Sequence, residues 1–318
     1  MHIPDGWLTL SVSLFSWCLT SLALSFALSR VKKENIEKIT TIGAISAVIF
    51  VAQMLNFPIV GGTTGHLLGG ALAVFVIGLS GALIAMFTVL LVQAAVFADG
   101  GILALGANFL NMGIIGSLVA YSIKKSTNKL LPQNKLTFFG SAVVAGFASV
   151  VIASAFAAVE LSLSGSTTLE LSLPLILGFH SLIGIGEGIL TLAILLYLKS
   201  VEFPVLESRD ESAVSFVSSF KQVSRPALGL GILLIFLSVL SLFAFSDPDG
   251  LESAVSTLIP GLKGGALSLG IADGYDFLGL GAIWGTFLSA LFGITLLAGI
   301  FGIPYLALKE RAERTPSG

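Results

Sequence analysis

Charged residues are scarce in this sequence. Asp, Glu, Lys and Arg make up 11% of its 318 residues, whereas 55% are hydrophobic and the mean hydropathy is +1.00. Because a soluble domain carries about 25% charged residues, this composition excludes an ordinary water-soluble protein and indicates that most of the chain lies in lipid. No cluster of basic residues is large enough to indicate a nucleic-acid partner.

Further absences narrow the possible chemistry. The single cysteine, Cys18, lies in an apolar run, where we expect a small buried residue; it has no partner for an intrachain disulfide or a thiol-based zinc site. The sequence has no GxxxxGK[ST] pattern, which argues against ATP binding through a P-loop, and no HExxH pattern, which argues against a zinc protease of that type. The start lacks the basic stretch of a cleavable signal peptide, so we expect it to be retained.

Long apolar runs make up most of the chain. A helix needs about 20 apolar residues to cross a bilayer roughly 30 Å thick. The sequence predicts an all-α polytopic membrane protein with nine segments, at 7–28, 39–57, 67–79, 81–98, 102–122, 136–160, 174–199, 227–246 and 278–304. Segment 67–79 covers only about 20 Å. We therefore expect the glycine-rich stretch 58–66 to be irregular backbone that dips inward and carries His66 below the outer surface.

Basic residues alternate regularly between the predicted loops. With the amino terminus outside, nine crossings place every Lys and Arg except Lys263 on the cytoplasmic side, as the positive-inside rule requires. Joining 67–79 to 81–98 would destroy this pattern, so we predict a break near Gly78-Leu79-Ser80-Gly81. The outer loops are acidic and are expected to attract cations; their carboxylates are Asp5, Asp99, Glu160, Glu170, Asp247, Asp249, Glu252, Asp273 and Asp276.

The composition changes between residues 200 and 226, where charged residues return. We interpret 200–226 as a cytoplasmic linker between a seven-segment module, residues 1–199, and a two-segment module, residues 227–318. The second module contains a long predicted outer loop, 247–277, which begins with the sequence DPDGLE.

The first two residues offer three nitrogen atoms to one ion. The terminal amine of Met1, the amide nitrogen of His2 and the imidazole Nδ1 of His2 can close two fused chelate rings, and a further imidazole such as that of His66 would complete a four-nitrogen plane. Square-planar nitrogen sites favour Ni²⁺ or Cu²⁺. A terminal histidine is ordinarily a solvated residue, but here an apolar segment begins at residue 7 and keeps the terminus near the bundle.

Other polar residues fall inside predicted transmembrane segments, where ionisable groups are costly and usually face a cavity or a partner. His180 and Glu187 are seven residues apart and share one helical face; they are candidates either for supporting the metal ligands or for a buried polar pair. Asn108 and Asn111 also share a face, and we expect them to bond the inserted amino terminus or a neighbouring helix.

Motifs along essentially the whole chain resemble those of one family. They are the start MHIPDG, the runs GHLLGG from Gly65, FADGG from Phe97 and HSLIGIGEG from His180, and the sequence PDGLE from Pro248. Together they resemble the cobalt/nickel substrate-binding (S) subunits of energy-coupling factor transporters, the CbiM/NikM type, fused to a PDGLE module that is similar to the small CbiN/NikN accessory subunit.

The resemblance implies a site, a substrate and partners. The metal would be held by Met1, His2 and His66, with Ni²⁺ or Co²⁺ as transported substrate and no resident cofactor. The implied partners are a transmembrane coupling (T) subunit and ATPase subunits, in the membrane of a prokaryotic cell, with the amino terminus outside and the carboxyl terminus in the cytoplasm. The family handles both metals, and a downstream role in cobalamin synthesis or in nickel-enzyme assembly fits it equally; four planar nitrogens favour nickel.

Two other classes of function would use the same histidines. A membrane metalloenzyme needs an open coordination position and a nearby general base, and Asp5 is the carboxylate closest in sequence to either His2 or His66. A stand-alone metal channel needs weak binding and fast exit, whereas fused chelate rings predict slow release. We therefore expect a transporter subunit and not an enzyme.

Overall fold

The computed structural model of the protein describes residues 1–31, 36–60, 62–203, 224–245, 247–262, 264–267, 269, 271–281 and 283–314. Most of the predicted linker, residues 204–223, lies outside these residues, as does Lys263. In the described part, seven helices are long and apolar enough to cross a membrane, which confirms the all-α polytopic class.

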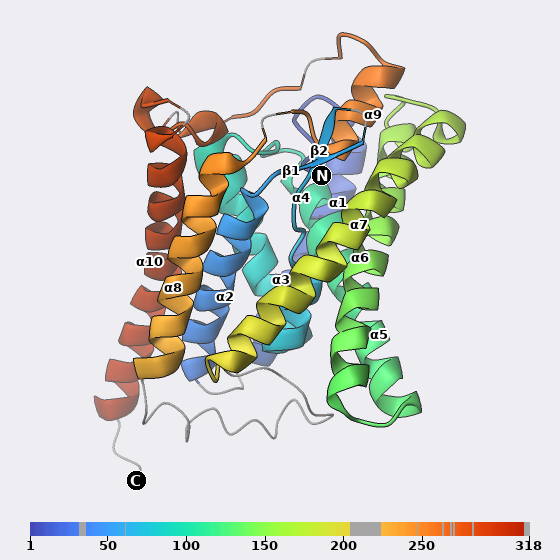
Figure 1. The fold of residues 1–318 in the computed structure, drawn as a ribbon. Helices are drawn as coiled ribbons and strands as arrows, with labels where there is room; N and C mark the ends of the chain where they lie inside the picture. Colours follow the sequence, from blue (N-terminus) through green and yellow to red (C-terminus); the bar gives the residue numbers. More distant parts are fainter. Residues whose placement is uncertain are drawn as a thin grey trace.

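The helices form one bundle (Figure 1). The first module contains α1 (Leu10–Val31), α2 (Glu37–Gln53), α3 (Gly70–Phe97), α4 (Leu105–Asn108), a π-helical turn (Phe109–Ile115), α5 (Gly116–Leu130), α6 (Lys135–Leu163) and α7 (Leu169–Ser200). The remaining helices are α8 (Ser224–Leu240), α9 (Gly250–Leu258) and α10 (Trp284–Arg314). Both α8 and α10 pack against α2, while α9 packs against α7. The part of the chain after the linker therefore rests directly on the first module.

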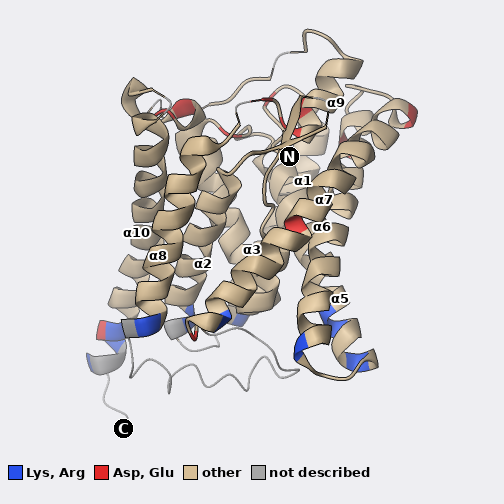
Figure 2. Ribbon diagram, in the orientation of Figure 1, with Lys and Arg blue, Asp and Glu red and all other residues tan. Residues whose placement is uncertain are grey.

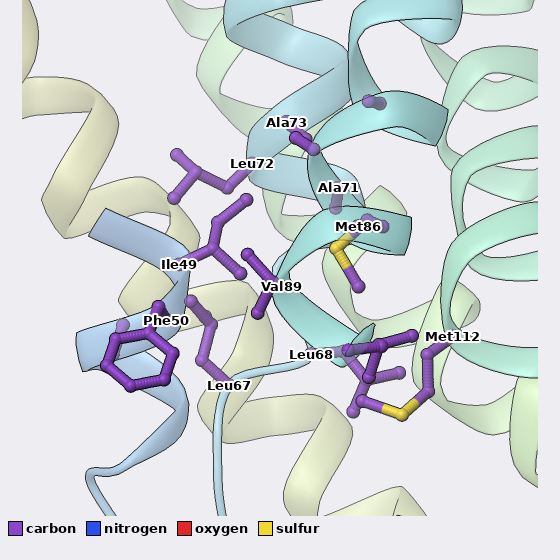
Figure 3. Packing of buried hydrophobic residues seen from close by; sticks show 14 of the residues in the cluster. Ile49, Phe50, Leu67, Leu68, Ala71, Leu72, Ala73, Met86, Val89 and Met112 are labelled. Atoms are coloured by element: carbon purple, nitrogen blue, oxygen red, sulfur yellow. The ribbon is translucent and has the colours of Figure 1, made fainter. Parts of the chain in front are cut away.

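Helix α3 contains the predicted break. Gly78 has φ 71° and ψ 175°, a conformation that interrupts the helix and that glycine adopts at little steric cost. A straight helix of this length would span about 42 Å, yet His66 before it and Asp99 after it line the same pocket. The chain must therefore reverse at Gly78. Figure 3 shows Leu72 and Val89, one from each half, packed in the buried cluster with Ile49 of α2.

The stretch before α3 differs from the expectation of irregular backbone. It forms a short antiparallel hairpin of β1 (Phe57–Ile59) and β2 (Thr63–Gly65). Pairing of Phe57 with Gly65 and of Ile59 with Thr63 satisfies much of its backbone. Strand β2 also contacts the second module just before α9, because the Thr64 N–H donates to the Pro248 carbonyl at 2.9 Å. His66, directly after β2, is only 5% exposed.

Charge is segregated along the bundle. Figure 2 shows Lys and Arg gathered at the end opposite the amino terminus, with most acidic residues near the amino-terminal end. Two expectations were wrong. Glu160 is not an outer-loop carboxylate, because α6 continues to Leu163 and buries Glu160 against Asn111. Cys18 is exposed rather than buried, because it lies on the face of α1 turned away from the other helices. The predicted outer loop 247–277 also contains the helix α9.

Candidate metal centre

The amino-terminal segment is buried inside the bundle. Four of its side chains are at most 7% exposed: Met1, His2, Ile3 and Trp7. Asn108, the last residue of α4, accepts a hydrogen bond from the Ile3 N–H at 2.7 Å and donates one to the Ile3 carbonyl at 3.0 Å. The carboxylate of Asp5 accepts hydrogen bonds from two backbone N–H groups, those of Ile102 and Ala104, in the segment just before α4. These bonds fix the first residues, so His2 is not a frayed terminal residue.

His66 presents one ring nitrogen to the terminal amine. Its Nδ1 lies 2.9 Å from the Leu67 carbonyl; because a carbonyl only accepts, Nδ1 carries the proton and Nε2 keeps its lone pair. This Nε2 lies 2.9 Å from the nitrogen of Met1. The rings of His2 and His66 stack with centroids 5.3 Å apart and planes inclined by 20°. A ring oriented by a carbonyl on its other nitrogen is the usual arrangement of a metal-binding histidine.

A carboxylate from the second module joins this group. Asp249 Oδ2 lies 2.5 Å from the Met1 nitrogen and 3.9 Å from His66 Nε2. One potential ligand atom from each of His2, His66 and Asp249 lies within 4.8 Å of the others. The other oxygen of Asp249 accepts the N–H groups of Leu251 and Glu252 and so caps α9. We had not assigned Asp249 to the site from sequence, although the PDGLE motif marks it.

Burial sets the protonation of these groups. Burial lowers the pKa of His2 and, with the neighbouring Met1 amine and His2, lowers the pKa of His66 to about 3. Both rings are therefore neutral at pH 7, which is the form that binds a metal ion. Burial by itself would raise the pKa of Asp249, but the charge of the Met1 amine, His66 and the hydrogen bonds from the amine and the Glu252 N–H together outweigh burial and lower that pKa below its usual range. Asp249 is therefore an ionised carboxylate.

His2 also contacts a series of hydrogen-bonded polar side chains. Asp99, which follows α3, places Oδ1 at 3.2 Å from His2 Nδ1. The Tyr275 hydroxyl donates to Asp99 Oδ2 at 2.6 Å and accepts from Gln93 Nε2 at 3.2 Å. His2 Nε2 is buried and has no partner among the described residues. From sequence, Asp99 is expected only to attract cations in an outer loop, although it also lies in the FADGG run; Tyr275 carries no motif that would indicate a role.

The residues predicted to support the ligands fall into two groups. Asn108 holds Ile3, and Glu187 accepts the N–H groups of Leu68 at 2.5 Å and Gly69 at 3.0 Å, directly after His66. Both therefore act on segments that carry predicted ligands. Asn111 and His180 do not, as their contacts lie elsewhere.

Asn111 and His180 are buried but lie outside the ligand group. Asn111, in the π-helical turn, donates to Glu160 at 2.6 Å. The His180 ring donates through Nδ1 to the Ile176 carbonyl at 2.8 Å, one turn earlier in α7, and its Nε2 has no partner among the described residues. Among those residues, the group of close ligand atoms does not include His180.

The predicted ligands surround a polar pocket of about 360 Å³. Residues from six separate stretches line it, including His2, Gln53, His66, Asp99, Asp249 and Tyr275. Gln53, at the end of α2, donates to the Leu68 carbonyl at 2.6 Å, and its Oε1 is buried without a partner among the described residues. Neutral imidazoles, an amine and carboxylates in one pocket are a donor set suited to late first-row divalent metals.

Comparisons with known proteins agree with this chemistry. A protein provisionally named as a fused nickel transport protein, NikMN, from Archaeoglobus fulgidus is 32% identical over 305 residues, which cover 94% of this chain and 96% of that protein. Another, provisionally named as the fused nickel transport protein LarMN of Lactiplantibacillus plantarum, is 32% identical over 269 residues, covering 79% of this chain and 77% of that protein.

Solved structures and a family description point the same way. A crystal structure of a transition metal transporter is 31% identical with a TM-score of 0.57, and the match covers 64% of this chain and 94% of that chain. The family CbiM, described as the cobalt uptake substrate-specific transmembrane region, matches residues 2–204. The chain therefore belongs to the CbiM family of membrane proteins for cobalt and nickel transport.

Proposed function

We propose that the chain is the substrate-binding subunit of an ATP-driven energy-coupling factor importer, which takes up Ni²⁺ or Co²⁺ from outside the cell. The ion would be held by four nitrogens: the amine of Met1, the amide and imidazole of His2, and Nε2 of His66. The contact that carries the proposal is the 2.9 Å separation of the Met1 nitrogen from His66 Nε2, across 65 residues of sequence. Nothing in the local chain geometry requires those two atoms to meet.

The proposed capture of the ion follows from the ligands. The amine, the deprotonated amide and an imidazole of consecutive residues form fused rings, and His66 completes the plane. Binding needs a neutral amine and a deprotonated amide, so nickel affinity should fall as the pH falls. A planar set of four nitrogens favours Ni²⁺ over Co²⁺.

The orientation in the membrane follows from charge. Lys and Arg gather at the end of the bundle away from the amino terminus (Figure 2), and cytoplasmic ends collect such residues. This supports an external metal site and a cytoplasmic carboxyl terminus. The pocket carboxylates Asp99, Asp249 and Glu252 would then attract cations from outside.

Release toward the cytoplasm requires partners. The sequence has no P-loop pattern, so the energy would come from ATPase subunits acting through a transmembrane coupling subunit. Glu187 of α7 is bonded to the backbone that follows His66. A movement of α7 on docking to the coupling subunit would therefore displace His66 and open the nitrogen plane.

The test is to block the terminal amine. Adding residues before Met1 should abolish nickel binding to the purified chain, because the amine becomes an amide and the chelate rings cannot form. The same residues added after Gly318 serve as the control and should leave binding unchanged. Affinity is measured by competition with a coloured chelator, and the absorption spectrum is recorded for nickel and for cobalt. Full nickel affinity in the amino-terminally extended chain would exclude the proposed site.

A further inference from the structure

The second module reaches the predicted ligand His2 through one side chain. Tyr275 donates its hydroxyl proton to Asp99 Oδ2 at 2.6 Å, and Asp99 Oδ1 lies 3.2 Å from His2 Nδ1. A hydroxyl has a single proton, so the 3.2 Å contact with Gln93 Nε2 must be one that Tyr275 accepts. The hydrogen bonds therefore run in one direction: Gln93 donates to Tyr275, and Tyr275 donates to Asp99.

The Tyr275 backbone is held in an uncommon conformation. Its φ is +61°, which non-glycine residues adopt infrequently and which persists where surrounding contacts determine it. Its ring stacks on that of Phe97, with centroids 5.0 Å apart and planes inclined by 19°. The centroid of the Phe50 ring lies 6.3 Å from that of Tyr275. The ring therefore docks the second module on the first, while the hydroxyl is directed to Asp99. These two roles are chemically separable.

We infer that Tyr275 is a positioning residue of the metal site, which acts through Asp99 on the ring of His2. The inference rests on the proposed four-nitrogen site. A carboxylate at Nδ1, the nitrogen of His2 that would bind the ion, orients the His2 ring in the metal-free chain. It also places a negative charge next to a divalent ion in a partly buried pocket, where charges interact more strongly than in water. Without the hydroxyl, Asp99 Oδ2 loses its partner and the carboxylate can turn away from His2.

This role gives the fused module a direct function in binding. Asp249 contacts the amine of Met1 and Tyr275 bonds to Asp99, which contacts His2, so the module contacts Met1 directly and reaches His2 through Asp99. The module would thereby set the affinity and the geometry of the ion without supplying any of the four nitrogens.

The test is Tyr275→Phe in the full chain, which keeps the stacked ring and removes the hydroxyl. Nickel affinity should fall about tenfold, at the lower end of the effect of losing a residue that orients a metal ligand, and the visible absorption band of the bound nickel should shift. Tyr197→Phe is the matched control, because it also removes a hydroxyl that joins the two modules, through the Gly229 carbonyl at 2.8 Å. It should change neither quantity.

A measurement without metal separates this inference from the proposed function. The chain has three histidines, so ¹⁵N-histidine labelling gives few ring signals, and the His2 signal should move in Tyr275→Phe but not in Tyr197→Phe. If the amino-terminally extended chain still bound nickel at full affinity, the proposed chelate would be excluded, but the ¹⁵N measurement would still show whether Tyr275 acts on the ring of His2. Asp99→Asn is a second variant, which should weaken nickel binding at least as much.

Three outcomes would overturn the inference. One is equal loss of affinity in the two tyrosine variants, which would mean that any loosening of the modules has this effect. Another is tighter nickel binding in Tyr275→Phe, which would make Asp99 a competitor of the ion. The third is wild-type affinity, spectrum and His2 signal in Tyr275→Phe, or wild-type affinity in Asp99→Asn.

Discussion

The two modules bring different kinds of atom to one pocket. The first module supplies all four proposed nitrogens, from Met1, His2 and His66, together with the Asp99 carboxylate, whereas the second supplies oxygens, from Asp249 and Tyr275. The nitrogen side is held by the bundle itself, through Asn108 and the helices around it. The oxygen side lies on the segments between α8 and α10, which rest on the first module through the packing of α9 on α7, a stacked ring and strand-like contacts.

The difference indicates that the two modules have different roles in metal binding. Nitrogens buried in a rigid bundle set which ion binds, since imidazole and amine ligands select late first-row metals. Carboxylates at the outer end act through charge and orientation, which change rates and affinities by smaller factors. Changes on the nitrogen side should therefore have larger effects than changes on the oxygen side.

The largest effect is expected for His66→Ala. It removes a proposed ligand, so nickel affinity should fall by more than the roughly 10- to 100-fold typical of losing a group that only supports a ligand. His180→Ala is the control, because His180 is equally buried but lies outside the group of close ligand atoms; it should lose less than about tenfold. Equal losses, measured by chelator competition, would mean that all three histidines share the site.

An intermediate effect is expected for Glu187→Gln. The carboxylate accepts hydrogen bonds from two backbone N–H groups after His66. The amide of glutamine has only one oxygen that can accept, so its NH₂ would face the second N–H and that hydrogen bond would be lost. Nickel affinity should fall roughly 10- to 100-fold. Glu160→Gln is matched in size and burial but contacts Asn111, so its nickel affinity should stay near that of the wild type. Similar thermal denaturation of both variants would show that the difference is local, and similar affinities would contradict the proposed support of His66.

The smallest effect is expected for Asp249→Asn. Asparagine can still cap α9, but the charge beside the Met1 amine is lost, so nickel association should slow by less than about tenfold and depend less on salt. Asp247→Asn removes a charge from the lining of the same pocket without touching the amine. Stopped-flow rates should show the larger change in Asp249→Asn. Equal association rates in the two variants would mean that these carboxylates act only through their summed charge, and that the contact of Asp249 with the Met1 amine has no separate effect.

Local chemistry was enough to predict much of the fold. Apolar runs predicted the membrane-spanning helices, and loop charge predicted that 67–98 breaks near Gly78, where the structure has a non-helical residue. The errors arose where packing decides. Glu160 lies at the end of an apolar run, and its contacts with Asn111 and Ser16, from distant parts of the sequence, satisfy its carboxylate when α6 buries it. The 58–66 stretch takes part in a hairpin, in which β1 pairs with β2 and Thr64 also bonds to Pro248, far along the chain.

The sequence by itself determined the nitrogen donors, because an amine, an amide and an imidazole in consecutive residues are set by covalent geometry. That His66 supplies the fourth nitrogen remains a prediction; its Nε2 lies close to Met1 in a segment that Glu187 holds through the Leu68 and Gly69 N–H groups. Only the tertiary structure brought Asp249 and Tyr275 to the pocket. Their sequence distance from Met1 and His2 spans most of the chain, and such contacts depend on how α8, α9 and α10 pack, which no local pattern encodes.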